Sequence, residues 1–225
     1  MRLIPVLALS LASITLSGCF GPQAAVGVQQ VDSLVGRVER VHLDAELSRE
    51  RIQEAVDDVR ALVRREFTGD VAEAYALFVE AIDKSEEQTA RLRSNLKPMH
   101  QTAGEVYDAW TADLQSFSSP TLRQRSEARR DLAAERYVAV VNAMTPAVEG
   151  LEAYNKILRD HALFLSYDLN ASSVKDLEPE LDILRDNASA LDERIDNLLR
   201  AASEFVQATA PLGKVHLTGE AATGR

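Results

Sequence analysis

Apolar residues recur along this chain at alternating spacings of three and four, the pattern of helices that bury one face in a bundle. The pattern occupies four long segments separated by short polar breaks, and we find no convincing strand between them. We therefore predict an all-α fold, an elongated antiparallel four-helix bundle whose helices run up, down, up and down.

The first predicted helix covers residues 28–67, and its apolar stripe keeps the heptad spacing without a slip. Val35, Val56 and Val63 widen the stripe beyond the seam of an isolated coiled coil, which favours a bundle. Asp70 then supplies an N-cap for the next helix. The stripe consists of Val31, Leu34, Val38, Val41, Ala45, Ser48, Ile52, Ala55, Val59 and Leu62.

The second predicted helix covers residues 71–117 and contains Pro98. A proline inside a helix removes a hydrogen bond and costs about 3 kcal/mol, so either the helix kinks there or two helices meet. The stripe stays in phase from Leu96 through Met99 to Ala103, which favours a kink.

The third predicted helix covers residues 120–168. Ser119 is a suitable N-cap, Pro120 suits the first helical position, and Pro146 should kink the helix. Its stripe consists of Leu122, Leu132, Tyr137, Val141, Met144, Val148, Leu151, Leu158, His161 and Leu165.

A turn at residues 169–173 leads to the fourth predicted helix, in which Pro179 falls early enough to be tolerated. The bundle is predicted to cover residues 28–209, and glycines and small residues predict a flexible tail over residues 210–225. The last stripe consists of Leu177, Leu181, Leu184, Ala188, Leu191, Ile195, Leu198, Ala202 and Phe205.

Small residues fall at one height on all four helices when positions are counted from the turns. This layer is either a close-packed neck or an under-filled pocket, and a neck is favoured because empty space is costly. Its members are Ala45, Ser48, Ser85, Thr89, Gly150 and Ala188.

Residues 1–18 have the features of a cleavable secretory signal: one basic residue, Arg2, then an apolar run too short to span a bilayer. The run ends in Leu-Ser-Gly-Cys, which resembles the lipobox of bacterial lipoproteins. The resemblance implies cleavage between Gly18 and Cys19 and acylation of Cys19, whereas the alternative is an ordinary signal with a chance cysteine. Phe20 in place of aspartate implies transfer to the outer membrane. Residues 19–27 are predicted to be a short spacer.

Composition narrows the possible partners. The 225 residues are 46% hydrophobic and carry 25 basic and 35 acidic side chains, so the chain can fold but has a net charge of −10. An acidic surface disfavours nucleic acid as a partner. With one cysteine in the chain, no intramolecular disulfide is possible.

Catalytic patterns are absent from the sequence. The four histidines form no zinc motif, and phosphate-binding and nucleophile-elbow motifs are missing. Glu39-x-x-His42 is a single Glu-x-x-His match, whereas a di-metal bundle needs this motif on each of two helices. His161, beside Asp160, is interpreted as a core or boundary histidine with a satisfied hydrogen bond. We therefore expect no catalytic residue, metal or cofactor.

Several short stretches resemble the bacterial family catalogued as domain of unknown function 2959. The similarity covers most of the chain after Cys19 and is most specific from Trp110 to Leu177; Ser166 and Tyr167 stand where the family pattern has basic residues. It implies a helical, lipoprotein-like envelope protein and no reaction. The matching stretches are Trp110-Thr-Ala-Asp-Leu, Leu122, Ser126, Leu132, Arg136-Tyr137, Met144, Leu158-Arg-Asp-His-Ala-Leu-Phe-Leu165 and Leu169-Asn-Ala.

Two functions remain open. The favoured one is a non-enzymatic periplasmic lipoprotein, bound to the bilayer through acylated Cys19, that scaffolds or binds envelope proteins as a helical rod. The alternative is a ligand-binding or weakly enzymatic bundle with a site in the core between its helices.

Topology and anchor together predict which end of the rod faces the membrane. The first helix starts at the lipid and the second returns, so the basic cluster after Pro120 should lie at the bilayer. This cluster is either a membrane-proximal patch or a solvated face paired with Glu127, Asp131 and Glu135. It consists of Arg123, Arg125, Arg129 and Arg130, and the opposite, partner-facing tip of Gly69, Leu169, Asn170 and Ala171.

Overall fold

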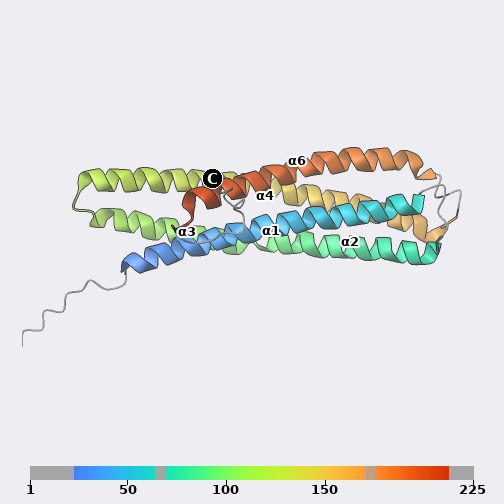
Figure 1. Ribbon diagram of the computed structural model, residues 1–225, viewed down its shortest axis with the longest axis horizontal. Coiled ribbons are helices and arrows are strands. Elements are labelled where there is room, and N and C mark those ends of the chain that lie inside the picture. The colour runs from blue at the N-terminus through green and yellow to red at the C-terminus, as the bar shows by residue number, and fades with distance from the viewer. Residues whose placement is uncertain (1–22, 64–68, 171–172, 174–175, 213–225) are drawn as a thin grey trace, which may run out of the picture.

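The computed structural model describes residues 23–63, 69–170, 173 and 176–212. All regular structure within these ranges is helical, which confirms the predicted all-α bundle (Figure 1). The elements are α1 (Gln23–Val63), α2 (Val71–Ser94), α3 (Leu96–Asp113), a single 3₁₀ turn (Leu114–Ser116), α4 (Pro120–Tyr167) and α6 (Glu178–Thr209).

The helices form an elongated antiparallel bundle. α1 packs against α2 and α6, and α4 completes the bundle by packing against α6 and α2, so each long helix touches its neighbours in the chain. The start of α1 and the α3–α4 connection lie at one end of the rod, and the α2 start and the α4 end lie at the other (Figure 1). The 48 residues of α4 alone give a length of about 72 Å at 1.5 Å per residue.

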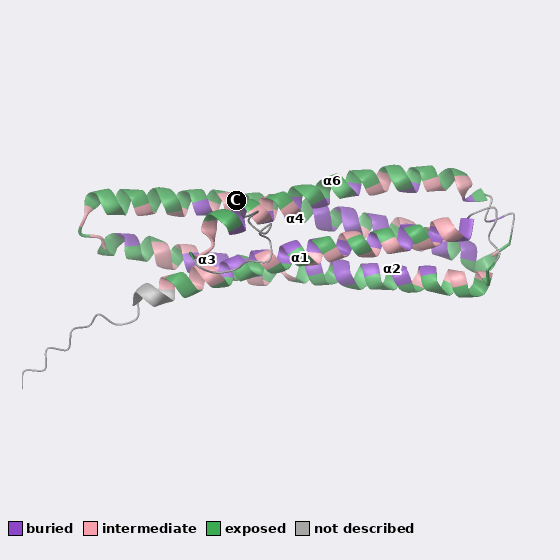
Figure 2. Cartoon of the chain, viewed as in Figure 1, coloured by how far each residue is buried: buried purple, intermediate pink, exposed green. Residues whose placement is uncertain are grey.

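The predicted stripes form one continuous hydrophobic core along the rod, seen as buried segments on the inner helix faces in Figure 2. Nine of the ten stripe positions of α1 are buried, and Val31 is partly buried. Val35, Val56 and Val63 are buried too, as the wider stripe indicated. Phe78, Tyr154 and Phe205 are the largest fully buried side chains.

The second predicted helix is interrupted at a single residue, Asn95. Pro98 has no backbone N–H, so the carbonyl of Ser94 cannot accept the usual bond from four residues ahead. Asn95 nevertheless keeps helical angles, φ −73° and ψ −20°, and the amide of Met99 donates to its carbonyl at 3.1 Å. The two pieces therefore follow one another as α2 and α3. In contrast, α4 continues through Pro146 as one helix, although Pro146 cannot donate to the carbonyl of Asn142.

Two boundaries differ from the predicted ones. α1 begins at Gln23, five residues earlier than predicted, so the second half of the predicted spacer is helical. Ala24 and Ala25 favour a helix, and one glycine costs only about 1 kcal/mol. At the other boundary, α3 ends at Asp113 rather than at Phe117, whose backbone is extended.

The prediction that Leu122 and Leu132 belong to the core was wrong. Their side chains are 53% and 45% exposed, respectively. Leu132 stands five residues before Tyr137, about 140° away around the helix at 100° per residue, and the buried position of that turn is Ala133. Leu122 keeps the spacing but belongs to the first turn of α4, at the end of the rod where α3 and α4 extend farther than α6 (Figure 1). Among the described residues, no fourth helix covers Leu122 at that height.

Candidate functional site

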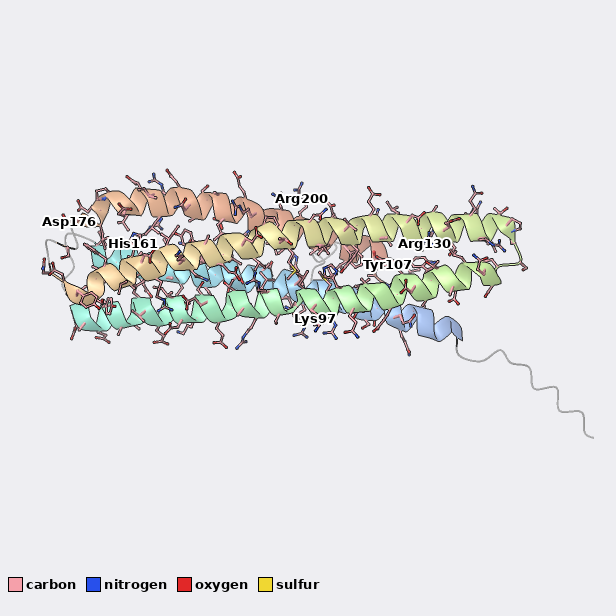
Figure 3. All side chains as sticks on the ribbon, turned by 180° about the vertical axis from the view of Figure 1, so that it is seen from behind. Lys97, Tyr107, Arg130, His161, Asp176 and Arg200 are labelled. Atoms are coloured by element: carbon pink, nitrogen blue, oxygen red, sulfur yellow. The ribbon has the colours of Figure 1, made fainter. Side chains whose placement is uncertain are left out.

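The predicted site residues are divided between the two ends of the rod. Gly18, Cys19 and Ala171 lie outside the described residues. The four arginines lie in the first turns of α4, at the end where α1 begins, and Gly69, Leu169 and Asn170 lie at the opposite end. Figure 3 shows the same division, with Tyr107 and Arg130 toward one end and His161 and Asp176 at the other.

The arginines do not form one flat patch. Arg123 donates to the carbonyl of Phe117 at 2.9 Å, and Arg130 donates to Asp131 at 2.6 Å and to Thr111 at 3.1 Å. Arg123 and Arg130 therefore face α3. The ion pair between Arg130 and Asp131 is one of the local pairs expected if the cluster is a solvated face. Arg125 and Arg129 are exposed and, at 100° per residue, lie on the far side of α4 from Arg123 and Arg130.

α6 ends well before the α3–α4 connection (Figure 1), so no described helix occupies the fourth position of the bundle there. The rings of Tyr137 and Phe205 meet at 6.4 Å between centroids, which sets the relative height of α4 and α6. Because the helices are antiparallel, Thr209 lies level with about Ala133. α4 continues from there to Pro120, about 20 Å farther. We call the part of the rod beyond the end of α6 the open end.

A groove of about 410 Å³ lies at the open end where α6 stops. Trp110 is held in its wall by a hydrogen bond from Nε1 to the hydroxyl of Ser126 at 2.9 Å. The hydroxyl of Thr209 is buried and has no hydrogen-bond partner among the described residues. The lining is mostly apolar and comprises Gly27, Val28, Gln30, Val31, Val106, Ala109, Trp110, Asp113, Phe117, Ser126, Thr209 and Pro211.

In the predicted layer of small residues, α4 and α6 approach closely at Gly150, and a hollow of about 130 Å³ lies beside this contact between the two helices. A Cβ on Gly150 would lie 3.0 Å from Leu191, and Arg49 of α1 pairs with Asp192 of α6 at 3.6 Å. Ser48 is 1% exposed. The contact at Gly150 and the burial of Ser48 favour the neck interpretation at these two positions.

Buried polar side chains join α2 to α4 in this layer, and the sequence analysis missed their central member, Asn155. Ser85 donates to its side-chain oxygen at 2.6 Å, and its amide nitrogen donates to Thr89 at 3.0 Å. Asn155 is 3% exposed. In the sequence, the signal for this role was the polar side chain of Asn155 in a turn whose other inward-facing residues are apolar. Nearby, Gln88 donates to the carbonyl of Asp44 at 3.1 Å.

A second groove, of about 550 Å³, lies over this layer between α2 and α4. Arg159 crosses it to pair with Asp83 at 2.7 Å and Glu86 at 2.6 Å, and these carboxylates raise the pKa of its guanidinium. Arg93 pairs with Glu152 in the same way. Because its charges are paired across the groove, it has less capacity for a ligand than the groove at the open end.

Two clustered tyrosines are chemically inert at neutral pH. Burial raises the pKa of Tyr137 to about 12, and burial together with Tyr137 raises the pKa of Tyr107 further. Both phenols therefore stay protonated and offer no nucleophile. Tyr137 shares a 2.8 Å hydrogen bond with His100, which supports a structural role.

His161 has the hydrogen bond that its interpretation required, at 2.7 Å from Nδ1 to the carbonyl of Ile157. Within the part of the chain that the structure describes, no three histidine, cysteine or acidic side chains are grouped to hold a metal ion. No described helix has the length and apolar composition needed to cross a bilayer.

The tip has an exposed apolar surface that the sequence analysis did not single out. Leu163, Phe164 and Tyr167, in the last turns of α4, are 58%, 47% and 88% exposed. Large apolar side chains exposed together indicate an interaction surface. Their signal in the sequence is the excess of apolar residues beyond the stripe positions Leu158 and Leu165.

Comparison with known proteins identifies one family. Its model, described as a protein of unknown function (DUF2959), matches residues 20–209. No curated protein and no solved structure matches the chain.

Proposed function

Because the chain belongs to the DUF2959 family, whose description states no activity, we propose a function from the geometry: a membrane-anchored, non-enzymatic lipoprotein of the bacterial envelope. Acylated Cys19 would hold the rod on the periplasmic face of the outer membrane. The rod would present a partner-binding tip at a distance from the bilayer.

The observation that carries this proposal is the different character of the two ends. α1 begins at Gln23, so only three residues separate it from Cys19, and the four steps between the two Cα atoms reach at most about 14 Å. The open end must then lie close to the anchor. The tip with Leu163, Phe164 and Tyr167 lies at the far end of α4, about 70 Å away.

The tip is well suited to bind a partner because hydrogen bonds hold the start of α2 and the end of α4 in place. The carboxylate of Asp70 accepts the amides of Ala72 and Glu73 at 2.8 and 3.1 Å, which caps α2. Tyr75 then ties α2 to the end of α4 by donating to the carbonyl of Ala162 at 3.0 Å. The exposed side chains of α4 are thus presented on a rigid support.

The proposed orientation predicts that the arginines of the open end contact anionic headgroups. The chain from residue 20 keeps the whole buried core, Leu34 to Val206, and can be used without the lipid. Replacing the four arginines of the basic cluster with glutamine is expected to weaken its binding to anionic vesicles at least tenfold. Each surface arginine contributes about 1 kcal/mol to such binding.

Binding is measured by vesicle co-sedimentation at 0.1 M salt, where charges more than about 10 Å away are screened. The matched control replaces four exposed cations elsewhere on the rod, Arg91, Lys156, Arg185 and Arg200, with glutamine. Equal binding of the cluster variant and the unmodified chain would contradict the proposed orientation.

A further inference from the structure

Pro98 of α3 and Pro146 of α4 lie at nearly the same height on neighbouring helices. Two contacts join these helices, and each proline lies between them in its own stretch of chain. Counted from either contact at 1.5 Å per residue, the prolines are within about 10 Å of one height. Each proline leaves the carbonyl four residues before it without its helical donor, so the rod is weakened twice at this level. The contacts are Arg93 with Glu152 and His100 with Tyr137.

The interruption at Asn95, which we call the α2–α3 joint, has lost further regular helical bonding. The amide of Asn95 donates to the carbonyl of Leu92 at 3.2 Å, three residues back rather than four. The carbonyl of Arg91, its usual acceptor, receives the hydroxyl of Ser94 at 2.7 Å instead. Bonds to the third residue back have poorer geometry than α-helical ones, and in mid-helix they often mark a hinge.

α1 contains a glycine near the same level. Asn95 donates its side-chain amide to Asp44 of α1, and counting from this contact places Gly36 within about 8 Å of the height of Pro98. A Cβ on Gly36 would have no atom within 4 Å, so no close approach requires glycine there. Since glycine weakens a helix interior, α1 is also less stiff at this level.

α6 is the long helix that has neither residue in its interior. From Leu181 to Thr209 its sequence contains no proline and no glycine. α6 packs against α1 and α4, so the α2–α3 joint lies diagonally across the bundle from it. Bending of the rod would therefore occur about α6 and would open or close the joint on the opposite side.

Asp44 holds the α2–α3 joint against α1. Its carboxylate accepts the side-chain amides of Asn95 and Gln88, and its carbonyl accepts Gln88 as well, at 3.1 Å. Hydrogen bonds to a carboxylate are stronger than bonds between neutral groups. Removing this one side chain would therefore release the joint from α1.

We propose that the rod has a transverse hinge at the level of Pro98 and Pro146, at which the open end bends relative to the tip, and that Asp44 limits the bending. Hinges in proteins are a few residues, often at the ends of elements, that absorb backbone changes. The inference goes beyond the proposed function and does not depend on the membrane anchor. On a bilayer, the hinge would let the tip reach partners at different distances.

Double electron–electron resonance tests the hinge, because it measures the distance distribution between two spin labels on introduced cysteines. The chain from residue 20 has no cysteine of its own. Labels at the exposed residues Ala76 and Asp108 span the joint, and labels at the exposed residues Ala72 and Ala90 lie within α2. We expect a broad distribution centred near about 48 Å for the first pair and a narrow one near about 27 Å for the second.

Replacing either proline should stiffen the rod. Pro98→Ala and Pro146→Ala each restore an amide that can donate four residues back, so each should narrow the distribution of the spanning pair about twofold. Asp44→Ala should broaden it by a similar factor. The control Asp186→Ala changes an exposed acidic residue of α6 and should leave the width unchanged.

Equal widths for the spanning pair and the pair within α2 would overturn the hinge. Narrowing by Pro98→Ala without narrowing by Pro146→Ala would confine the motion to the α2–α3 joint and would refute a hinge across the rod. If Asp44→Ala fails to fold, Asp44→Asn keeps the shape and removes the charge, and an unchanged width would refute the role of Asp44. The measurement uses no lipid, so its failure is distinct from a failure of the proposed orientation.

Discussion

Cys19→Ser is expected to release the chain from the membrane fraction once the membranes are washed with salt. Each buried methylene of a lipid anchor contributes about 0.8 kcal/mol, and two or more acyl chains give stable anchoring where one gives marginal binding. The arginines of the open end alone supply far less. The serine variant loses the thiol to which the lipid would be attached, so only weak, salt-sensitive binding should remain.

The measurement combines incorporation of labelled palmitate with cell fractionation. The unmodified chain should take up label and sediment with the outer membrane, and Cys19→Ser should do neither. A matched control, Ser17→Ala, changes a neighbouring residue of the predicted signal and should keep both properties. An unlabelled parent chain, or a serine variant that remains in the membrane, would contradict the lipoprotein proposal.

Asn155→Leu is expected to lower the free energy of unfolding by about 1–3 kcal/mol, the cost of leaving a buried polar group unpaired. Ser85 donates to the Asn155 side chain, and Thr89 accepts from it. Leucine has a similar volume but cannot bond to either hydroxyl. Chemical denaturation monitored by circular dichroism gives the change.

The control variant replaces all three side chains of this hydrogen-bond network. Combining Asn155→Leu with Ser85→Ala and Thr89→Val removes the hydroxyls along with the amide, so most of the lost stability should return, because no buried hydroxyl is then left unpaired. If the triple variant is as unstable as Asn155→Leu alone, the loss comes from packing, and the hydrogen bonds of this layer are not its cause.

The helices of this fold were predictable because their signals are local. The heptad stripe of α1, the Ser119 cap and the early proline of α6 each appear in the sequence and in the structure. Pro98 was recognised as a disruption, and only its form, a one-residue interruption at Asn95, required the structure.

Some features could not be predicted from the sequence, because they depend on how helices that are distant in the chain meet and where each one ends. Leu122 follows the stripe and is exposed, because α6 ends at Thr209, short of its position. Likewise, the spacing of Asn155 does not reveal that it meets Ser85 of a different helix. The groove at the open end follows from the same difference in length and could not be predicted from any one helix.

Neutron reflectometry of the lipidated chain on a supported anionic bilayer tests most directly whether the rod stands on its open end and lifts the tip. At low coverage the account predicts a protein layer about 70 Å thick, the length of α4 at 1.5 Å per residue. A layer of only about 20–25 Å, the width of two helices side by side, would show the rod lying flat and would contradict the account.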